Sequence, residues 1–266
     1  MMHRYSAPIG VHYVATGERH LIEAASSRRS VKAQMPDLPA ALFTDIPDHP
    51  LTKNFDHVDL VRIADRTNHD VVEPMLRTPF EKTLHLDTDT FVCGDCSDVF
   101  EALDFFEFAA VQDPYRSDLA VETFPQSMPT LNGGVIAYRL TPAVIALLES
   151  WPRIHQEKFA WRTRQNQPSL REAVYRSQAR VLILPPEYNL RSWHPIALGG
   201  FGKVRIIHDR RSDMARLSEV LNAGSRPRVF GRIDWRLAFY YYVTKTRIVV
   251  TRMLRRISRG ADSNSH

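Results

Sequence analysis

One segment, LHLDTDTFV at residues 84–92, constrains the fold more than any other part of the sequence. Its first half has the apolar character of a buried β-strand, and that strand ends in two carboxylates, Asp87 and Asp89. Two aspartates at a strand end repel each other, and placing them there is costly unless they share a cation. Their oxygen atoms are hard ligands that suit Mg²⁺ or Mn²⁺. The alternative interpretation is that the pair only caps the following loop.

Elsewhere in the chain, short apolar runs alternate with segments that have a helical apolar face, and turn residues separate them. We expect strands at residues 12–15, 40–44, 58–63, 82–87, 108–112, 134–138, 181–184 and 204–207. We expect helices at 19–27, 71–76, 97–103, 168–177 and 213–222, and one that begins at Pro142. Ser97 is the expected N-cap of the third of these helices. This alternation predicts an α/β fold with a mostly parallel sheet flanked by helices.

The ends of the predicted strands carry the candidate site. In an α/β sheet, ligands collect at the carboxyl ends of the strands, where the chain leaves for its helices. Small or polar residues lie at or beside these ends: Ala15, Thr16, Asp45, Asp87, Thr88, Asp89, Asn132, Gly133, Gly134, His208 and Asp209. We therefore expect these residues at one edge of the sheet. Topology alone predicts their proximity and leaves their chemistry open.

Length and composition limit the number of domains and the cellular compartment. A chain of 266 residues suits one compact domain, with room for an appendage. The sequence contains no apolar run of transmembrane length, and its start lacks the apolar core of a signal peptide. Cys93 and Cys96 cannot form a disulfide framework, and as two ordinary thiols they agree with a reducing compartment. We therefore expect a cytoplasmic protein.

The positive charge is concentrated at the C-terminus. Residues 226–260 carry ten Lys and Arg side chains against one acid, a net charge of +9, whereas residues 1–225 are slightly acidic. An acidic body argues against nucleic-acid binding. We divide the chain into a domain at 1–225 and a basic tail at 226–266. Between residues 235 and 259 the tail predicts an amphipathic helix with a basic face, which is typical of peripheral contact with a membrane. The alternative is a terminal helix packed on the domain.

Seven short segments also occur in a specific order: HYVATG at 12–17, ALFTD at 41–45, TPFEKTLHLDTDTFVCGDCSDVFEAL at 78–103, LNGGVIAYR at 131–139, NQPSL at 166–170, LPPEYNLR at 184–191 and IIHDRR at 206–211. In order and spacing, the set resembles the GT-A nucleotide-diphospho-sugar glycosyltransferases. Within them it is similar to the family-8-like branch of glycogenin and the bacterial lipopolysaccharide galactosyltransferases. The resemblance implies a GT-A, Rossmann-like fold.

The resemblance also implies roles for individual residues. Asp87, Asp89 and His208 would hold a divalent metal, Mn²⁺ or Mg²⁺, that bridges the diphosphate of the donor. Asn166 and Gln167 fall on the family's Asp-Gln pair, whose glutamine lies beside the anomeric carbon of the donor sugar. Gln167 and Asp89 are therefore the implied catalytic residues. The implied substrate-binding residues are Ala15, Thr16, Asp87, Thr88, Asn132, Gly133, Gly134 and Asn166.

Three positions depart from the family pattern. Asn166 stands where the family has an aspartate, which removes one carboxylate from the implied sugar site. The basic residue that usually precedes the strand ending in the carboxylate pair falls near residue 71, and Arg66 and Arg77 are the alternatives to it. After the late histidine, the family's Gly and Lys are not at their usual spacing, which leaves Arg210 or Arg211 to contact the phosphates.

Together these features predict transfer of a sugar from a nucleotide-diphospho-sugar to a saccharide or lipid-linked acceptor. The resemblance implies a uridine nucleotide and retention of anomeric configuration. One rival is a phosphatase of the haloacid-dehalogenase type, but that motif opens its domain and has Thr or Val where this chain has Phe91. The other rival is a non-catalytic sugar-nucleotide or carbohydrate-binding protein, with which Asn166 is compatible.

Overall fold

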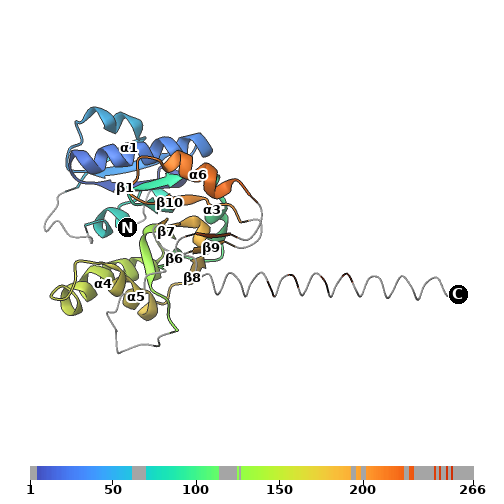
Figure 1. The fold of residues 1–266 in the computed structure, drawn as a ribbon. Helices are drawn as coiled ribbons and strands as arrows, with labels where there is room; N and C mark the ends of the chain where they lie inside the picture. Colours follow the sequence, from blue (N-terminus) through green and yellow to red (C-terminus); the bar gives the residue numbers. More distant parts are fainter. Residues whose placement is uncertain are drawn as a thin grey trace, which may run out of the picture.

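The computed structural model describes residues 5–61, 70–113, 125, 127–192, 196–198, 202–224 and 228–230, together with positions 243, 246, 250 and 253. A seven-stranded sheet lies at its centre, in the order β3-β2-β1-β4-β7-β6-β8 (Figure 1). These strands are β1 (Ala7–Ala15), β2 (Ala40–Thr44), β3 (His57–Leu60), β4 (Phe80–Leu86), β6 (Phe108–Gln112), β7 (Leu131–Arg139) and β8 (Val181–Leu184). The helices are α1 (Gly17–Gln34), α2 (Val72–Leu76), α3 (Asp98–Ala102), α4 (Pro142–Lys158), α5 (Gln167–Arg176) and α6 (Met214–Asn222), with short 3-10 helices η1 (Pro50–Asn54) and η2 (Pro186–Tyr188).

The sheet is mostly parallel. Neighbouring strands from β3 to β4 pair in parallel, and so do β6 and β8. The exception is β7, which runs antiparallel to both of its neighbours, β4 and β6. The α/β fold with a mostly parallel sheet, predicted from the alternation of strands and helices, is therefore confirmed.

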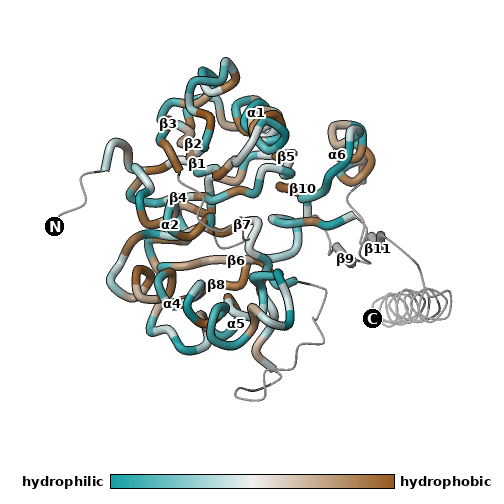
Figure 2. Tube along the Cα trace, turned by 90° about the vertical axis from the view of Figure 1, so that its left-hand side faces the viewer, coloured by the Kyte–Doolittle hydropathy of each residue, from teal (hydrophilic) through white to brown (hydrophobic). Residues whose placement is uncertain are grey.

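Helices cover both faces of this sheet. On one face, Leu21 and Val31 of α1 belong to the same buried cluster as Leu84 of β4. On the other face, Trp151 of α4 and Leu170 of α5 pack in a cluster with residues of β6 and β7. Figure 1 shows α1 on one side of the sheet and α4 and α5 on the other, and Figure 2 shows hydrophobic residues along the central strands between these layers. The layered core holds the strand ends in fixed positions.

Helix α1 is longer than its sequence pattern predicts. We expected it to end near residue 27, because Ser27, Arg28 and Ser30 interrupt the apolar face. In the structure these residues are buried, and the hydroxyls of Ser27 and Ser30 contact β1 and β5 (Thr90–Val92). Ser27 Oγ lies 3.0 Å from Tyr13 Oη and 2.7 Å from Thr90 Oγ1, and Ser30 Oγ accepts from the Val92 N–H. A polar but inward-facing turn therefore continues the helix. Ser97 is the N-cap of α3 as predicted, although its side chain makes no cap hydrogen bond.

Two small sheets stand beside the central one, and the sequence predicted neither pairing. One is an antiparallel ribbon of β5 (Thr90–Val92) and β10 (Ile206–His208), and the other joins β9 (Ile196–Leu198) to β11 (Arg228–Phe230). The strand expected at 204–207 is displaced, so that β10 ends on His208 itself. Figure 2 shows this ribbon and α6 projecting beside the main sheet.

Most of the predicted amphipathic helix at 235–259 lies outside the described residues. The four positions described there, 243, 246, 250 and 253, are helical and exposed. Three of them are apolar: Val243, Val250 and Met253. Among the described residues, no helix combines the length and the apolar character needed to cross a bilayer. The division at residue 225 remains a prediction.

Candidate functional site

The site is built where β4 ends and β7 begins. Asp87 follows β4 directly, and its backbone N–H donates to the Gly134 carbonyl of β7 at 2.8 Å. Because β7 runs antiparallel to β4, its first residues meet the last residues of β4 at one edge of the sheet. Residues 132–134 therefore lie beside the carboxylate pair, although they begin their strand.

The ribbon of β5 and β10 brings a distant histidine to the two aspartates. Thr90 of β5 pairs with His208 of β10, and the Asp209 N–H donates to the Asp89 carbonyl at 3.0 Å. His208 Nε2 lies 3.4 Å from Asp87 Oδ2 and 3.3 Å from Asp89 Oδ1. The ligand atoms of these three side chains all lie within 4.8 Å of one another. The structure thus brings together the three residues that the sequence suggested as metal ligands.

This cluster has the donor atoms and the space that a divalent cation needs. Two carboxylate oxygens and one imidazole nitrogen converge, and such a mixed set suits Mn²⁺ and also serves Mg²⁺. Gly134 provides the space, since a Cβ atom there would overlap the His208 ring and lie 2.6 Å from Asp87 Oδ2. Among the described residues, no other group of three such side chains converges in this way.

The electrostatics of the cluster follow from this proximity. Burial by itself lowers the pKa of His208, but the contacts with Asp87 and Asp89 outweigh it and raise the pKa to about 9. Burial alone would raise the pKa of Asp87, whereas His208 and His85 hold it well below its usual range. The pKa of Asp89 is lowered in the same way, with His208 as the main partner that opposes burial. Before a metal binds, the positive charge of protonated His208 therefore offsets part of the negative charge of the two carboxylates.

A series of hydrogen-bonded amide side chains contacts His208 through its Nδ1 atom. His208 Nδ1 lies 3.0 Å from Asn189 Oδ1, and Asn189 Nδ2 donates to Asn132 Oδ1 at 2.9 Å. Asn132 in turn donates to Asp113 Oδ2 at 3.1 Å. This arrangement keeps a hydrogen on Nδ1 and leaves Nε2 for the carboxylates or a metal, which is the usual role of such outer partners. Asn132 therefore lies behind the cluster, and Asn189, although it lies in the segment 184–191, was not predicted as a site residue.

The cluster faces a cavity of about 580 Å³. Four residues predicted from the resemblance line it besides the cluster itself: Thr16, Thr88, Asn166 and Gln167. Four others are not among the lining residues: Ala15, whose side chain is buried in the core, Asn132, Gly133 and Gly134. The remaining lining residues are Val14, Gly17, His20, Asp45, Asp70, Val71, Arg191 and Arg210.

The N-terminus of α1 points toward this cavity. Thr16 is the N-cap of this 18-residue helix, and its side chain makes no cap hydrogen bond. Gly17 has a φ of 75°, a left-handed conformation that favours glycine, and its N–H donates to Asp45 Oδ1 at 2.7 Å. The positive end of a helix stabilises phosphate groups near it. In this structure, the carboxylate of Asp45 accepts a hydrogen bond from one of these helix N–H groups.

Asn166 and Gln167 reach the cavity from the start of α5. The Asn166 carbonyl accepts from Trp151 Nε1 at 3.0 Å and from Ser169 Oγ at 2.9 Å, so that the backbone is tied to α4. Gln167 Oε1 is buried and has no hydrogen-bond partner among the described residues. An unsatisfied buried acceptor is costly. The Gln167 side chain is therefore available to a ligand group that donates a hydrogen bond.

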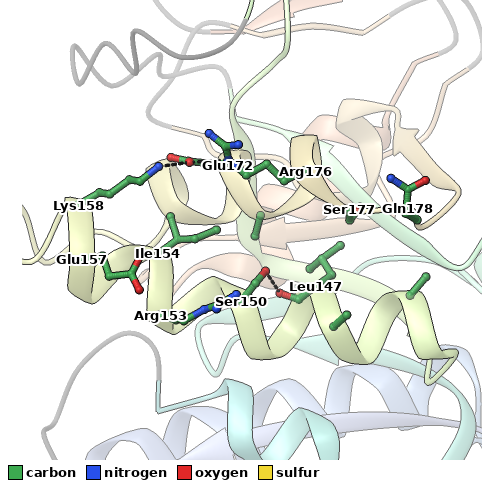
Figure 3. Close-up of a pocket in the computed structure, with 13 residues that line it drawn as sticks. Leu147, Ser150, Arg153, Ile154, Glu157, Lys158, Glu172, Arg176, Ser177 and Gln178 are labelled. Atoms are coloured by element: carbon green, nitrogen blue, oxygen red, sulfur yellow. Dashed lines mark hydrogen bonds and ion pairs between the residues drawn. The ribbon is translucent and has the colours of Figure 1, made fainter.

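A buried carboxylate locks α5 against α4 further along the helix pair. Glu172 is fully buried, and its Oε1 accepts from Lys158 Nζ and, at 2.7 Å, from Arg176 Nε (Figure 3). These residues line a separate hollow of about 450 Å³ between the two helices. The ion pairs fix the register of α5 and, through it, the position of Gln167.

Two arginines supply positive charge at the cavity. Arg210 Nε lies 3.4 Å from Asp89 Oδ2 and 3.5 Å from Glu23 Oε1. Arg191, which the sequence did not single out, places Nη1 3.4 Å from His208 Nδ1 and 3.5 Å from its Nε2. Of the other candidates, Arg77 pairs with Asp59 and Glu73 away from the cavity, and Arg211 pairs with Asp213. Residue 66 lies outside the described residues.

Solved structures with this fold are known, although no protein-family model and no curated protein sequence matches the chain. The galactosyltransferase LgtC, in complex with donor and acceptor sugar analogs, superposes with a TM-score of 0.58 over 80% of this chain and 94% of LgtC, at 12% identity. GlyE of Streptococcus pneumoniae TIGR4 gives 0.55 over 89% of this chain and 64% of GlyE, at 15% identity. An LgtC variant with glutamate replacing an active-site glutamine gives 0.53 at 14% identity, over 85% of this chain and 99% of that one. The chain therefore has the GT-A fold of these glycosyltransferases.

Proposed function

We propose that the chain is a metal-dependent glycosyltransferase that moves a sugar from a nucleotide-diphospho-sugar to a saccharide or lipid-linked acceptor. The observation that carries the proposal is the convergence of Asp87, Asp89 and His208 in a large polar cavity at the strand ends. In α/β sheets this is the place where ligands bind. The GT-A fold supports the assignment, since its solved relatives are glycosyltransferases and LgtC holds donor and acceptor sugar analogs.

In this proposal, the cluster and its neighbours bind the diphosphate. Asp87, Asp89 and His208 hold Mn²⁺ or Mg²⁺, which supplies positive charge for the phosphate oxygens of the leaving group. Arg210 and Arg191 line the same cavity and stabilise the negative charge that grows there as the glycosidic bond breaks. Thr16, at the N-terminus of α1, lies where the helix dipole favours the same charge. The backbone at Ala15 and Thr16 would contact the nucleoside, for which uridine is the proposed base.

The donor sugar is placed beside Asn166 and Gln167. Gln167 Oε1, buried and without a partner among the described residues, is suited to the positive charge that develops at the anomeric carbon or to a sugar hydroxyl. LgtC has a glutamine in its active site as well. Gly134 leaves room beside the metal ligands, and Thr88 lines the donor cavity. A retaining outcome is part of the proposal, as it is for the family that the sequence resembles.

A donor screen tests the function directly. The protein is incubated with a panel of nucleotide-sugars and Mn²⁺, and released nucleoside diphosphate and sugar are followed by mass spectrometry, with and without a chelator. We expect turnover of at least one donor, loss of turnover with chelator, and loss in Asp89→Asn at unchanged thermal stability. A non-catalytic binding protein would bind a donor without releasing nucleoside diphosphate, and a phosphatase would release phosphate from simple esters. Full turnover by Asp89→Asn would refute the metal assignment.

We further propose that the basic tail holds the enzyme at an anionic membrane surface, on the cytoplasmic side, beside a lipid-linked acceptor. Its net charge of +9 supports this, since each Lys or Arg near such a surface contributes about 1 kcal/mol. The apolar residues Val243, Val250 and Met253 are exposed on a helix, where they are available to lipid. Sedimentation with anionic and neutral liposomes, for the full chain and for a form ending at residue 222, is the test. Equal partitioning of the two forms would refute this role.

A further inference from the structure

Two histidines lie buried in the sheet behind the carboxylate cluster. His12 of β1 and His85 of β4 are direct neighbours in the parallel pairing, and their side chains are 0% and 1% exposed. Their Nδ1 atoms are 3.0 Å apart. The surroundings are otherwise mostly apolar, with Ile136 of β7 opposite His85 and the Phe43 ring 4.8 Å from the His12 ring, while the Pro74 carbonyl and the charge of Arg77 also act on His12. Central strands of parallel sheets usually carry aliphatic residues at such positions, so two polar rings there need an explanation.

The pair leads directly to Asp87. His85 lies two residues before Asp87 on β4, so both side chains emerge on the same face. His85 Nε2 is 3.8 Å from Asp87 Oδ1, and it has no hydrogen-bond partner among the described residues. The other carboxylate oxygen, Oδ2, is the one that faces His208 Nε2 at 3.4 Å. The two oxygens of Asp87 therefore face different partners.

The contact between the rings restricts where the ring hydrogens lie. Of two nitrogens 3.0 Å apart, one must donate and the other accept. Burial and the neighbouring His85 hold the pKa of His12 well below its usual range, so His12 is neutral and carries a single ring hydrogen. When that hydrogen is on Nδ1, His85 accepts at Nδ1 and carries its own hydrogen on Nε2. This is the atom that faces Asp87 Oδ1, and a carboxylate can only accept there.

We propose that His85, oriented by His12, is a positioning residue that holds Asp87 Oδ1 so that Oδ2 is presented to the metal together with Asp89 and His208. The inference rests on the proposed metal site and extends it to two residues outside the cavity. Outer partners of this kind fix the orientation of a ligand, and their loss usually weakens metal binding by about 10- to 100-fold. Asn189 holds His208 from the other side, at 3.0 Å from its Nδ1.

A matched pair of substitutions tests the polar contact between His85 and Asp87 separately from the packing. Methionine and glutamine have similar length and volume, but only glutamine ends in a hydrogen-bond donor. Mn²⁺ affinity is measured for His85→Met and His85→Gln by the electron paramagnetic resonance signal of free Mn²⁺, which does not depend on turnover. We expect binding to weaken about tenfold or more in His85→Met, and to recover most of that loss in His85→Gln. His12→Phe should weaken binding as well, because it leaves His85 Nδ1 without its partner. His57→Met, on the edge strand β3, is the control and should bind as the wild type does.

The outcomes separate this inference from the proposed function. If wild type and His85→Met bind Mn²⁺ equally well, the positioning role is wrong, and the metal site stands. If the wild type binds no Mn²⁺, both the site and the positioning role are wrong. Thermal unfolding in the presence of a chelator is measured for every variant, because a packing defect would lower stability without the metal. If His85→Met does not fold, the comparison of His85→Gln with His12→Phe decides, and equal wild-type affinity in both would overturn the proposal.

Discussion

Metal binding should displace one proton from the protein at neutral pH. His208 has a pKa of about 9 in the metal-free structure, because Asp87 Oδ2 and Asp89 Oδ1 lie 3.4 and 3.3 Å from its Nε2. At pH 7 its ring is therefore almost fully protonated. A metal needs the lone pair of Nε2, so the proton and the cation compete for the same atom. The two carboxylates have lowered pKa values, are already ionised at pH 7, and release no proton of their own.

The expected loss of metal affinity at pH 7 follows from the difference between pH 7 and the pKa of His208. Below about pH 9, apparent affinity should fall by about tenfold for each pH unit, so that binding at pH 7 is about 100-fold weaker than its limit at high pH. This factor corresponds to about 2.7 kcal/mol. The sign is set by the raised pKa: the protonated form is stabilised below pH 9, and affinity therefore increases as the pH rises from 6 to 8.

Isothermal titration calorimetry measures this proton directly. Mn²⁺ is titrated into the protein at pH 7 in buffers with different ionisation enthalpies, and the slope of the observed enthalpy against the buffer enthalpy gives the number of protons released. We expect a value near one for the wild type and near zero for His208→Gln, which we expect to fold and to bind more weakly. A slope near zero in the wild type, with affinity independent of pH between 6 and 8, would refute both the raised pKa and the role of His208 as a ligand.

Three further predictions use other parts of the structure. Gly134→Ala should abolish Mn²⁺ binding, because its Cβ would overlap the His208 ring, whereas Gly224→Ala, with open space at its Cβ, should bind as the wild type does in the same titration. The double variant Lys158→Met with Arg176→Met removes both cations from the buried Glu172 and should lower the free energy of unfolding by about 3 kcal/mol or more. Glu172→Gln should lower it by only about 1 kcal/mol, because Lys158 and Arg176 are half exposed. Urea denaturation measures both changes, and equal losses would contradict the prediction. Asn166→Asp should change the preferred donor or its KM more than thermal stability, since Trp151 and Ser169 bind the backbone carbonyl of Asn166; a donor profile that stays the same while the melting temperature falls would place Asn166 elsewhere.

The central sheet and the carboxylate pair of the metal cluster were predictable because their signals are local, whereas His208 was reached through the family resemblance. An apolar run that ends in Asp87 and Asp89 is both a strand and a candidate site, and the sheet edge follows from the alternation of elements. The length of α1 was not predictable, because Ser27 and Ser30 look like surface residues until their partners Thr90 and Val92 are known. An inward-facing polar group can be identified only from the three-dimensional contacts that satisfy it.

The same limit applies to the residues that support the site. Asn189 and Arg191 lie in the segment 184–191 of the family resemblance, but neither received a role there, and their roles follow from their contacts with His208. Arg77 looked suitable by sequence position but is held by Asp59 and Glu73 on another part of the surface. The strand-end motif therefore identified Asp87 and Asp89, the family resemblance pointed to His208, and only packing identified their partners.

Because of the β5–β10 ribbon, the site can be completed only after most of the chain has been synthesised. Thr90 and His208 pair directly although more than a hundred residues separate them, and three strands of the central sheet, β6, β7 and β8, lie between the two in sequence. A contact of such long range forms late, because closing the intervening loop costs entropy until the rest of the chain has folded. During synthesis, the two aspartates emerge long before the histidine that completes their site. Tight metal binding is therefore a mark of a finished chain, and a nascent or truncated domain that ends before β10 would hold Mn²⁺ only as weakly as an isolated pair of carboxylates.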